Sequence, residues 1–253
     1  MITKLFVLQS LRTINPLRCG ELLADRLRPV LPVHFKDIGD AGALFQELQA
    51  IQSEIVALAG PAVIHFHCHG NEQGIGLHNH LDQPTFLGWE QFRQIFRDIY
   101  NSAPVKPMIT FCSCKGLNTM QLIAQYEPCP YEAIAGCLEL VGFQDSIDAF
   151  YLFYSKLHAG AALVDAVVDV VQGFPHLKFF AAPAKVLAEL AWMKYKQEEL
   201  TPEVIRSRKA WIISQIVAIQ GGISPQQIAK LDALLTAESG ERDQQRHMEI
   251  FNT

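Results

Sequence analysis

Short apolar runs alternate with longer amphipathic runs over the first two-thirds of the chain. Short apolar runs predict strands covered on both faces, and apolar residues three or four positions apart predict helices that bury one side. Residues 62–67 are mostly apolar, whereas residues 43–58 carry leucine and isoleucine at helical spacing. The expected strands are residues 5–8, 33–38, 62–67, 108–111, 133–136 and 177–180, and the expected helices are residues 17–27, 43–58, 89–100, 117–126, 146–157 and 161–171.

This alternation predicts one α/β domain. Strands that take turns with helices form a largely parallel sheet, here of six strands, with helices on both faces in a three-layer sandwich. After about residue 183 the pattern is helical only, over residues 184–200, 202–220 and 225–238, and Thr201 and Ser224 each precede a proline, which is typical of helix starts. We therefore expect a sheet domain over residues 1–183 and a helical C-terminal extension over residues 184–253.

Composition narrows the function classes. The chain has 253 residues, of which 49% are hydrophobic and 19% charged, and its net charge is −5. The absence of a basic excess argues against nucleic acid as a partner. The apolar start is too short for a signal peptide, and charges interrupt the most apolar later stretch, so we expect a cytoplasmic protein with no membrane insertion. The six cysteines are then expected to be reduced.

Two expected strands end in residues that carry chemistry. The strand over residues 62–67 runs into His69 and Gly70, and the strand over residues 108–111 runs into Cys112, Ser113 and Cys114 before a glycine-containing turn. Parallel strands deliver their carboxyl ends to one edge of a sheet, so a thiol and an imidazole would share a cleft there.

These groups are those that amide hydrolysis requires. A thiolate attacks the carbonyl, and a nearby imidazole lowers the thiol pKa and protonates the leaving amine. The backbone N–H groups of Gly70 and Cys114 would hold the oxyanion. Cys112 competes as nucleophile, but Cys114 comes last before the charged turn and fits better, whereas Cys112 fits a small buried hydrophobe.

The same segments resemble a known family. Residues 65–70, which read HFHCHG, resemble the H-F-x-C-H-G segment of CHAT domains, caspase-like peptidases related to separase. Residues 113–116, SCKG, resemble the caspase A-C-R-G segment, whose histidine lies about 50 residues upstream. The following strand and two helices also resemble CHAT domains, although Phe143 stands where their pattern has an aspartate and Asp145 follows two residues later. The resemblance covers roughly residues 1–180.

The resemblance also implies a substrate pocket. Asp145 lies near the position of the separase-like aspartate that binds a basic side chain, which implies cleavage after Arg or Lys. Asp145 is alternatively a cap of the helix expected from residue 146. A rival for the pocket is Arg18, near the place where caspases put an arginine that selects aspartate. Cys112 stands where the caspase pocket has a glutamine, which favours Asp145.

We therefore expect a cysteine endopeptidase that acts on a protein substrate. The family resemblance implies a bacterial effector or defence protease, with an activating partner protein as a further possibility. No cofactor or metal is needed for this chemistry. Two alternatives stay open: a zinc-dependent hydrolase that uses the His- and Cys-rich strand ends, and a catalytically inactive caspase-like binding module.

Overall fold

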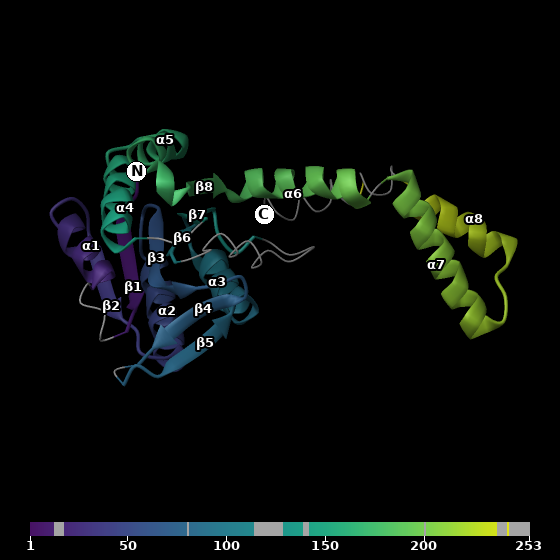
Figure 1. Ribbon diagram of the computed structural model, residues 1–253, viewed down its shortest axis with the longest axis horizontal. Helices are drawn as coiled ribbons and strands as arrows, with labels where there is room; N and C mark the ends of the chain where they lie inside the picture. Colours follow the sequence, from purple (N-terminus) through teal and green to yellow (C-terminus); the bar gives the residue numbers. More distant parts are fainter. Residues whose placement is uncertain are drawn as a thin grey trace. The chain divides into compact units, whose positions relative to one another are not determined.

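The computed structural model describes residues 1–12, 18–79, 81–113, 129–138, 142–199, 201–236 and 242. The chain divides near Ala184 into two compact units (Figure 1). The first unit contains the strands together with helices α1 to α5, and the described elements of the second unit, which includes the residues from Lys185 onwards, are helices. The helices expected after residue 183 are therefore present.

The first unit is built on a mostly parallel sheet. Six strands lie side by side in the order β2-β1-β3-β6-β7-β8, and among the described strands of this order only β8 runs antiparallel to its neighbour. With helices on both faces, this is the α/β three-layer sandwich that the sequence predicts. The six strands are β1 (Lys4–Ser10), β2 (Val33–Asp37), β3 (Ala62–Gly70), β6 (Met108–Cys112), β7 (Ala133–Cys137) and β8 (Phe179–Pro183).

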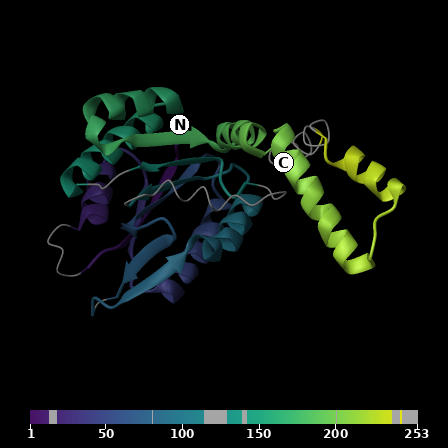
Figure 2. The ribbon, with the colours of Figure 1, turned by 45° about the vertical axis from the view of Figure 1, so that its right-hand side comes forward.

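Helices cover both faces because successive residues of a strand point to opposite sides. On β3, the His65 ring contacts Phe150 of α4, whereas the next residue, Phe66, packs edge-on against Phe92 and Phe96 of α3. Figures 1 and 2 show α1, α4 and α5 on one side of the sheet and α2 and α3 on the other. These helices are α1 (Cys19–Leu27), α2 (Ala41–Ile55), α3 (Trp89–Ser102), α4 (Phe143–His158) and α5 (Leu163–Gly173). The helix expected over residues 117–126 lies outside the described residues.

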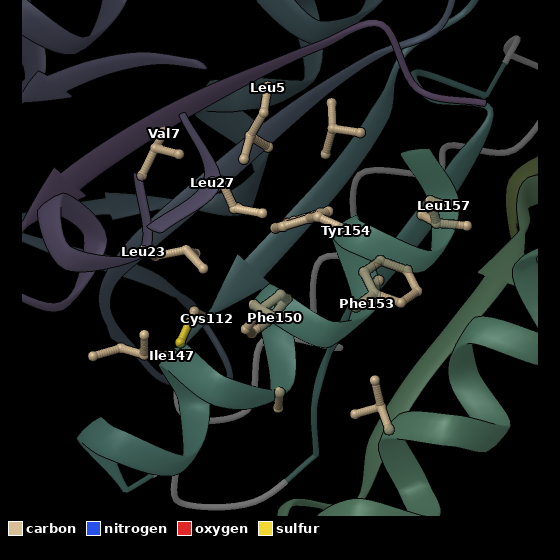
Figure 3. Close-up of a cluster of buried hydrophobic side chains, with 14 of the residues drawn as sticks. Leu5, Val7, Leu23, Leu27, Cys112, Ile147, Phe150, Phe153, Tyr154 and Leu157 are labelled. Carbon is tan, nitrogen blue, oxygen red and sulfur yellow. The ribbon is translucent and has the colours of Figure 1, made fainter. Parts of the chain in front are cut away.

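An apolar core fills the space between the sheet and helices α1 and α4 (Figure 3). Leu23 and Leu27 of α1 and Phe150 and Phe153 of α4 belong to this core, and all four side chains are fully buried. Burial of one such side chain contributes roughly 1.5–3 kcal/mol, so this core fixes both helices on the sheet.

The start of α1 docks on the sheet through a side chain of β1. The Gln9 side-chain oxygen accepts a hydrogen bond from the backbone N–H of Gly20 at 2.8 Å, which satisfies one of the free donors at the helix start. A Cβ atom on Gly20 would lie 3.1 Å from Gln9 Cβ and 3.2 Å from His67 Cβ. Glycine therefore lets the helix approach the carboxyl ends of β1 and β3 closely.

A hairpin missed by the sequence analysis extends the sheet to eight strands within the described chain. Strand β4 (Gly74–His78) pairs with the end of β3, and β5 (Pro84–Gly88) pairs with β4, both antiparallel. His69 and Gly70 pair with Gly76 and Ile75, so β3 continues beyond residue 67, where the sequence predicted its end. The strands of the hairpin are short and contain glycine or proline, which hides their pattern.

The second unit consists of α6 (Ala184–Glu199), α7 (Pro202–Gln220) and α8 (Pro225–Leu234). The predicted helix starts are confirmed, because Thr201 Oγ1 accepts from Val204 N–H at 3.3 Å and Ser224 Oγ accepts from Gln227 N–H at 3.2 Å. Gly221 ends α7 with a φ of 75°, a conformation that glycine adopts without strain. None of the helices in the described ranges is long and apolar enough to cross a membrane.

The hairpin depends on the absence of a side chain at residue 74. A Cβ atom there would lie 1.9 Å from the carbonyl oxygen of Leu87, which belongs to the paired backbone of β5. We expect Gly74→Ala to lower the free energy of unfolding by about 2–3 kcal/mol, measured by urea denaturation. Gly173→Ala is the matched control, since nothing lies within 4 Å of its added Cβ. Equal stability of the two variants would contradict this packing.

Candidate functional site

The imidazole of His69 emerges at the carboxyl end of β3. The side chains of His65 and His67 on the same strand face are buried, at 0% and 3% exposure, whereas His69 is exposed. Its nearest ring is that of His78 on β4, with the ring centroids 5.3 Å apart and the planes at 76°. An exposed imidazole at the end of a central strand is available to a substrate.

His78 is held from strand β1. Its backbone N–H donates to Ser10 Oγ at 2.9 Å, and its Nε2 accepts from the Nε–H of Arg12 at 3.4 Å. The His78 side chain is buried, with 7% exposure. The hairpin thus brings a second imidazole and a guanidinium beside His69.

These neighbours affect the protonation of His69. Partial burial is the largest cause that lowers its pKa, and the charge that His78 carries when protonated and the charge of Arg12 lower it further. The pKa of His78 is lowered in the same way by burial and by Arg12, while Asp82 opposes the shift. A neutral His69 at neutral pH can accept a proton from a thiol.

Cys112 is a buried thiol. It is 4% exposed at the end of β6, and its Sγ lies 3.7 Å from His67 Nε2. Burial is the main cause that raises its pKa well above the ordinary value of a thiol. A peptide backbone does not reach this pair, so Cys112 behaves as the small buried hydrophobe that the sequence suggested.

Cys114, the predicted nucleophile and oxyanion donor, lies outside the described residues, which end at Ser113 in this segment. The strands that lead to it and to His69 are adjacent, since β3 and β6 pair in parallel with His67 opposite Cys112. Gly70, the other predicted oxyanion donor, is the last residue of β3 and pairs with Ile75 of β4.

A buried polar network lies beneath this edge, around the two histidines that share a strand face with His69. His65 Nδ1 lies 2.8 Å from the Tyr154 hydroxyl and 3.0 Å from Thr110 Oγ1, and His65 Nε2 lies 3.5 Å from His67 Nδ1. The network thus runs from α4 through β6 and β3 to Cys112. Its members satisfy one another's hydrogen bonds, so the polar groups can stay buried. The period-two spacing of the histidines indicated hydrogen-bonded core histidines, whereas Thr110 and Tyr154 gave no signal in the sequence.

Asp145 lies in the first turn of α4, which begins at Phe143 rather than at residue 146. The residue that caps this helix is Gly142, so the capping role considered for Asp145 is wrong. Its carboxylate is half-exposed and lies 2.8 Å from His176 Nε2. The structure brings Asp145 near a basic ring instead of leaving it to cap the helix.

Arg18 has two carboxylate partners. Its Nε lies 2.9 Å from Glu21 Oε2 and its Nη2 lies 2.6 Å from Asp37 Oδ2. A guanidinium that already neutralises two acids has little charge left for a substrate aspartate. Arg18 is therefore already paired with two carboxylates of its own chain.

The His- and Cys-rich segment also raised the possibility of zinc. Among the residues that the structure describes, no three His, Cys, Asp or Glu side chains are grouped so that they could hold a metal ion. His65 and His67 instead use their ring nitrogens within the buried network.

Comparison with known proteins assigns no family to the chain. No family model and no curated protein matches the chain. Among solved structures, the chain is similar to Raptor from Chaetomium thermophilum, with 10% identity and a TM-score of 0.40 over 62% of this chain and 17% of that chain. The chain therefore spans less than a fifth of the Raptor chain, and the fold assignment rests on the strand order described above.

The buried histidines predict acid sensitivity. Burial, followed by the charge of His69, lowers the pKa of His67 from 6.5 to about 4, and burial also lowers that of His65. Below about pH 6.5 the unfolded chain binds protons that the folded chain does not bind. The free energy of unfolding should therefore fall from pH 6.5 towards pH 4, by up to about 1.4 kcal/mol per pH unit for each ring.

Urea unfolding between pH 7.5 and 4.5 measures this slope. We expect His67→Gln to flatten it, because the variant lacks one of the two rings. The matched control is His158→Gln, at the end of α4, where Nδ1 contacts the carbonyl of Ile2 at 2.9 Å. If His67→Gln keeps the slope of the wild type, His67 is not neutral and buried in the folded protein.

Proposed function

We propose that the protein is a cysteine endopeptidase of the caspase-like CHAT type, with Cys114 as nucleophile and His69 as acid/base. The observation that carries this proposal is the exposed imidazole of His69 on β3, directly beside strand β6, whose chain continues into Cys114. The order of strands and the HFHCHG and SCKG segments support the same family. The substrate is a protein.

The reaction follows from the chemistry of the two groups. The neutral imidazole of His69 takes the thiol proton of Cys114, and the thiolate attacks the scissile carbonyl carbon. The backbone N–H groups of Gly70 and Cys114 stabilise the oxyanion. The imidazolium then returns its proton to the leaving amine as the C–N bond breaks, and water hydrolyses the thioester. No cofactor takes part.

Burial argues against Cys112, one of the two candidate thiols, in this proposal. Cys112 is enclosed by the core and by His67, and burial raises its pKa, so it is a poor nucleophile at neutral pH. Cys114 follows two residues later in the sequence, after the strand has ended at Cys112. The nucleophile is therefore Cys114.

Asp145 selects a basic side chain before the cut bond. Its half-exposed carboxylate already attracts a basic group of the same chain, the His176 ring, at 2.8 Å. A substrate Arg or Lys would displace or share this contact and form a charge-assisted hydrogen bond, worth about 1.5–3 kcal/mol. A bacterial effector or defence protease that a partner protein activates fits this chemistry.

Labelling with an electrophilic peptide that ends in arginine tests the nucleophile. We expect the wild type to be labelled and to cleave peptides, and Cys114→Ala to lose label and about 10³-fold or more of its turnover. Cys112→Ala is the matched control and should keep the label. Undiminished turnover in Cys114→Ala, abolished instead by a chelator, would favour a zinc hydrolase, and a folded wild type that is inert would favour a binding module.

A peptide-library cleavage profile tests the pocket. We expect cleavage after Arg or Lys, with kcat/KM for these peptides about tenfold or more lower in Asp145→Ala, because the variant loses a charge-assisted hydrogen bond. Asp165→Ala removes a carboxylate from the first turn of α5 and is the matched control. Cleavage after aspartate would contradict the assignment of Asp145.

A further inference from the structure

The proposed acid/base group needs a neighbour that fixes its ring. A histidine that exchanges a proton with a nucleophile works best when a third group holds its orientation. Within the described residues, the ring packed against His69 is that of His78, in an edge-on contact with centroids 5.3 Å apart. His67, on the same strand face, is turned to the buried network, where its Nδ1 and Nε2 contact His65 and Cys112.

His78 is itself fixed by two contacts from the end of β1. Ser10 Oγ accepts its backbone N–H at 2.9 Å, and the Nε–H of Arg12 donates to its Nε2 at 3.4 Å. Since Nε2 accepts this hydrogen bond, the proton of the neutral ring is on Nδ1. Arg12 therefore sets both the position and the tautomer of His78.

The His78 ring carries a buried nitrogen that destabilises the fold, and packing alone does not explain why a histidine stands there. Its Nδ1 is buried and has no hydrogen-bond partner among the described residues. An unsatisfied buried donor destabilises a protein, and an apolar side chain would fill the same space without that cost. Since the His78 ring destabilises the fold and lies beside the exposed His69, we infer that it acts on His69.

We propose that His78 and Arg12 are positioning residues for the His69 imidazole, with Arg12 holding the His78 ring and His78 holding the His69 ring. This inference rests on the proposed function, because it assigns His69 the acid/base role. It adds the end of β1 and the β4–β5 hairpin to the machinery of the site. Neither residue is assigned a bond-forming or proton-transfer step.

The charges around His69 give this arrangement a second effect. The groups that face it are Arg12 from the end of β1, His67 from β3 and His78 from β4, and Asp82 acts on His78 from the turn beyond β4. Arg12 and His78 are cations or potential cations, so they disfavour a protonated His69. The positioning pair thus also keeps the imidazole in the neutral form that accepts the thiol proton.

Proton NMR titration of the His69 C2–H in the full chain tests the contact without any substrate, with His69→Gln used for assignment. We expect the midpoint to move to higher pH in His78→Gln and in Arg12→Gln, and to return towards the wild type in Arg12→Lys, which restores the charge. His158→Gln is the matched control and should leave the midpoint unchanged. An unchanged midpoint in both His78→Gln and Arg12→Gln overturns the inference.

Peptide cleavage separates this inference from the proposed function. We expect His78→Gln to lower kcat about tenfold or more while KM stays close to that of the wild type, because a displaced ring affects the chemical step. If the wild type cleaves no peptide but the His69 midpoint moves in His78→Gln and Arg12→Gln, the peptidase proposal is refuted and the contact between His78 and His69 is supported. Full activity in His78→Gln, with the wild type active, refutes the positioning role alone.

Discussion

The positions of His67, His69 and Cys112 depend on the backbone hydrogen bonds of strand β3. This strand pairs with β1 on one side and β6 on the other, and its last residues then leave the parallel sheet to pair with β4. The pairing with β6 places His67 opposite Cys112, and the pairing with β4 carries His69 out beside His78. Because a shift of one residue in a strand turns every side chain to the other face, these ladders determine which histidines are buried and which is exposed.

The three histidines of β3 differ in burial, and burial decides which of them a substrate can reach. His65 is enclosed by Phe150 and Tyr154 and shares its hydrogen bonds with a hydroxyl network, so its charged form is strongly disfavoured. His67 is buried one step further along, and His69 emerges at the edge. Desolvation is the largest cause of the lowered pKa in all three, but the exposed ring alone can meet a substrate and exchange a proton with it.

Arg18, Asp145 and Arg12 of the first unit differ in their partners within the chain. Arg18 is shared between Glu21 and Asp37, whereas Asp145 is paired with one half-exposed histidine. The described contact of Arg12 is with His78, which places a cation beside the imidazole on which the proposed reaction depends. Arg18 is thus occupied by two carboxylates of its own chain, whereas Asp145 and Arg12 each have one described partner, a histidine.

The sequence by itself determined the alternation of strands and helices, the helical extension and the strand that leads to His69. Apolar periodicity and the helix starts at Thr201 and Ser224 are local signals, and local signals predict the elements they occupy. Tertiary structure alone decided the hairpin and the approach of Arg12 and His78 to His69. Residues 12, 69 and 78 come together because three strands pair at one edge, and no local pattern records which strands become neighbours.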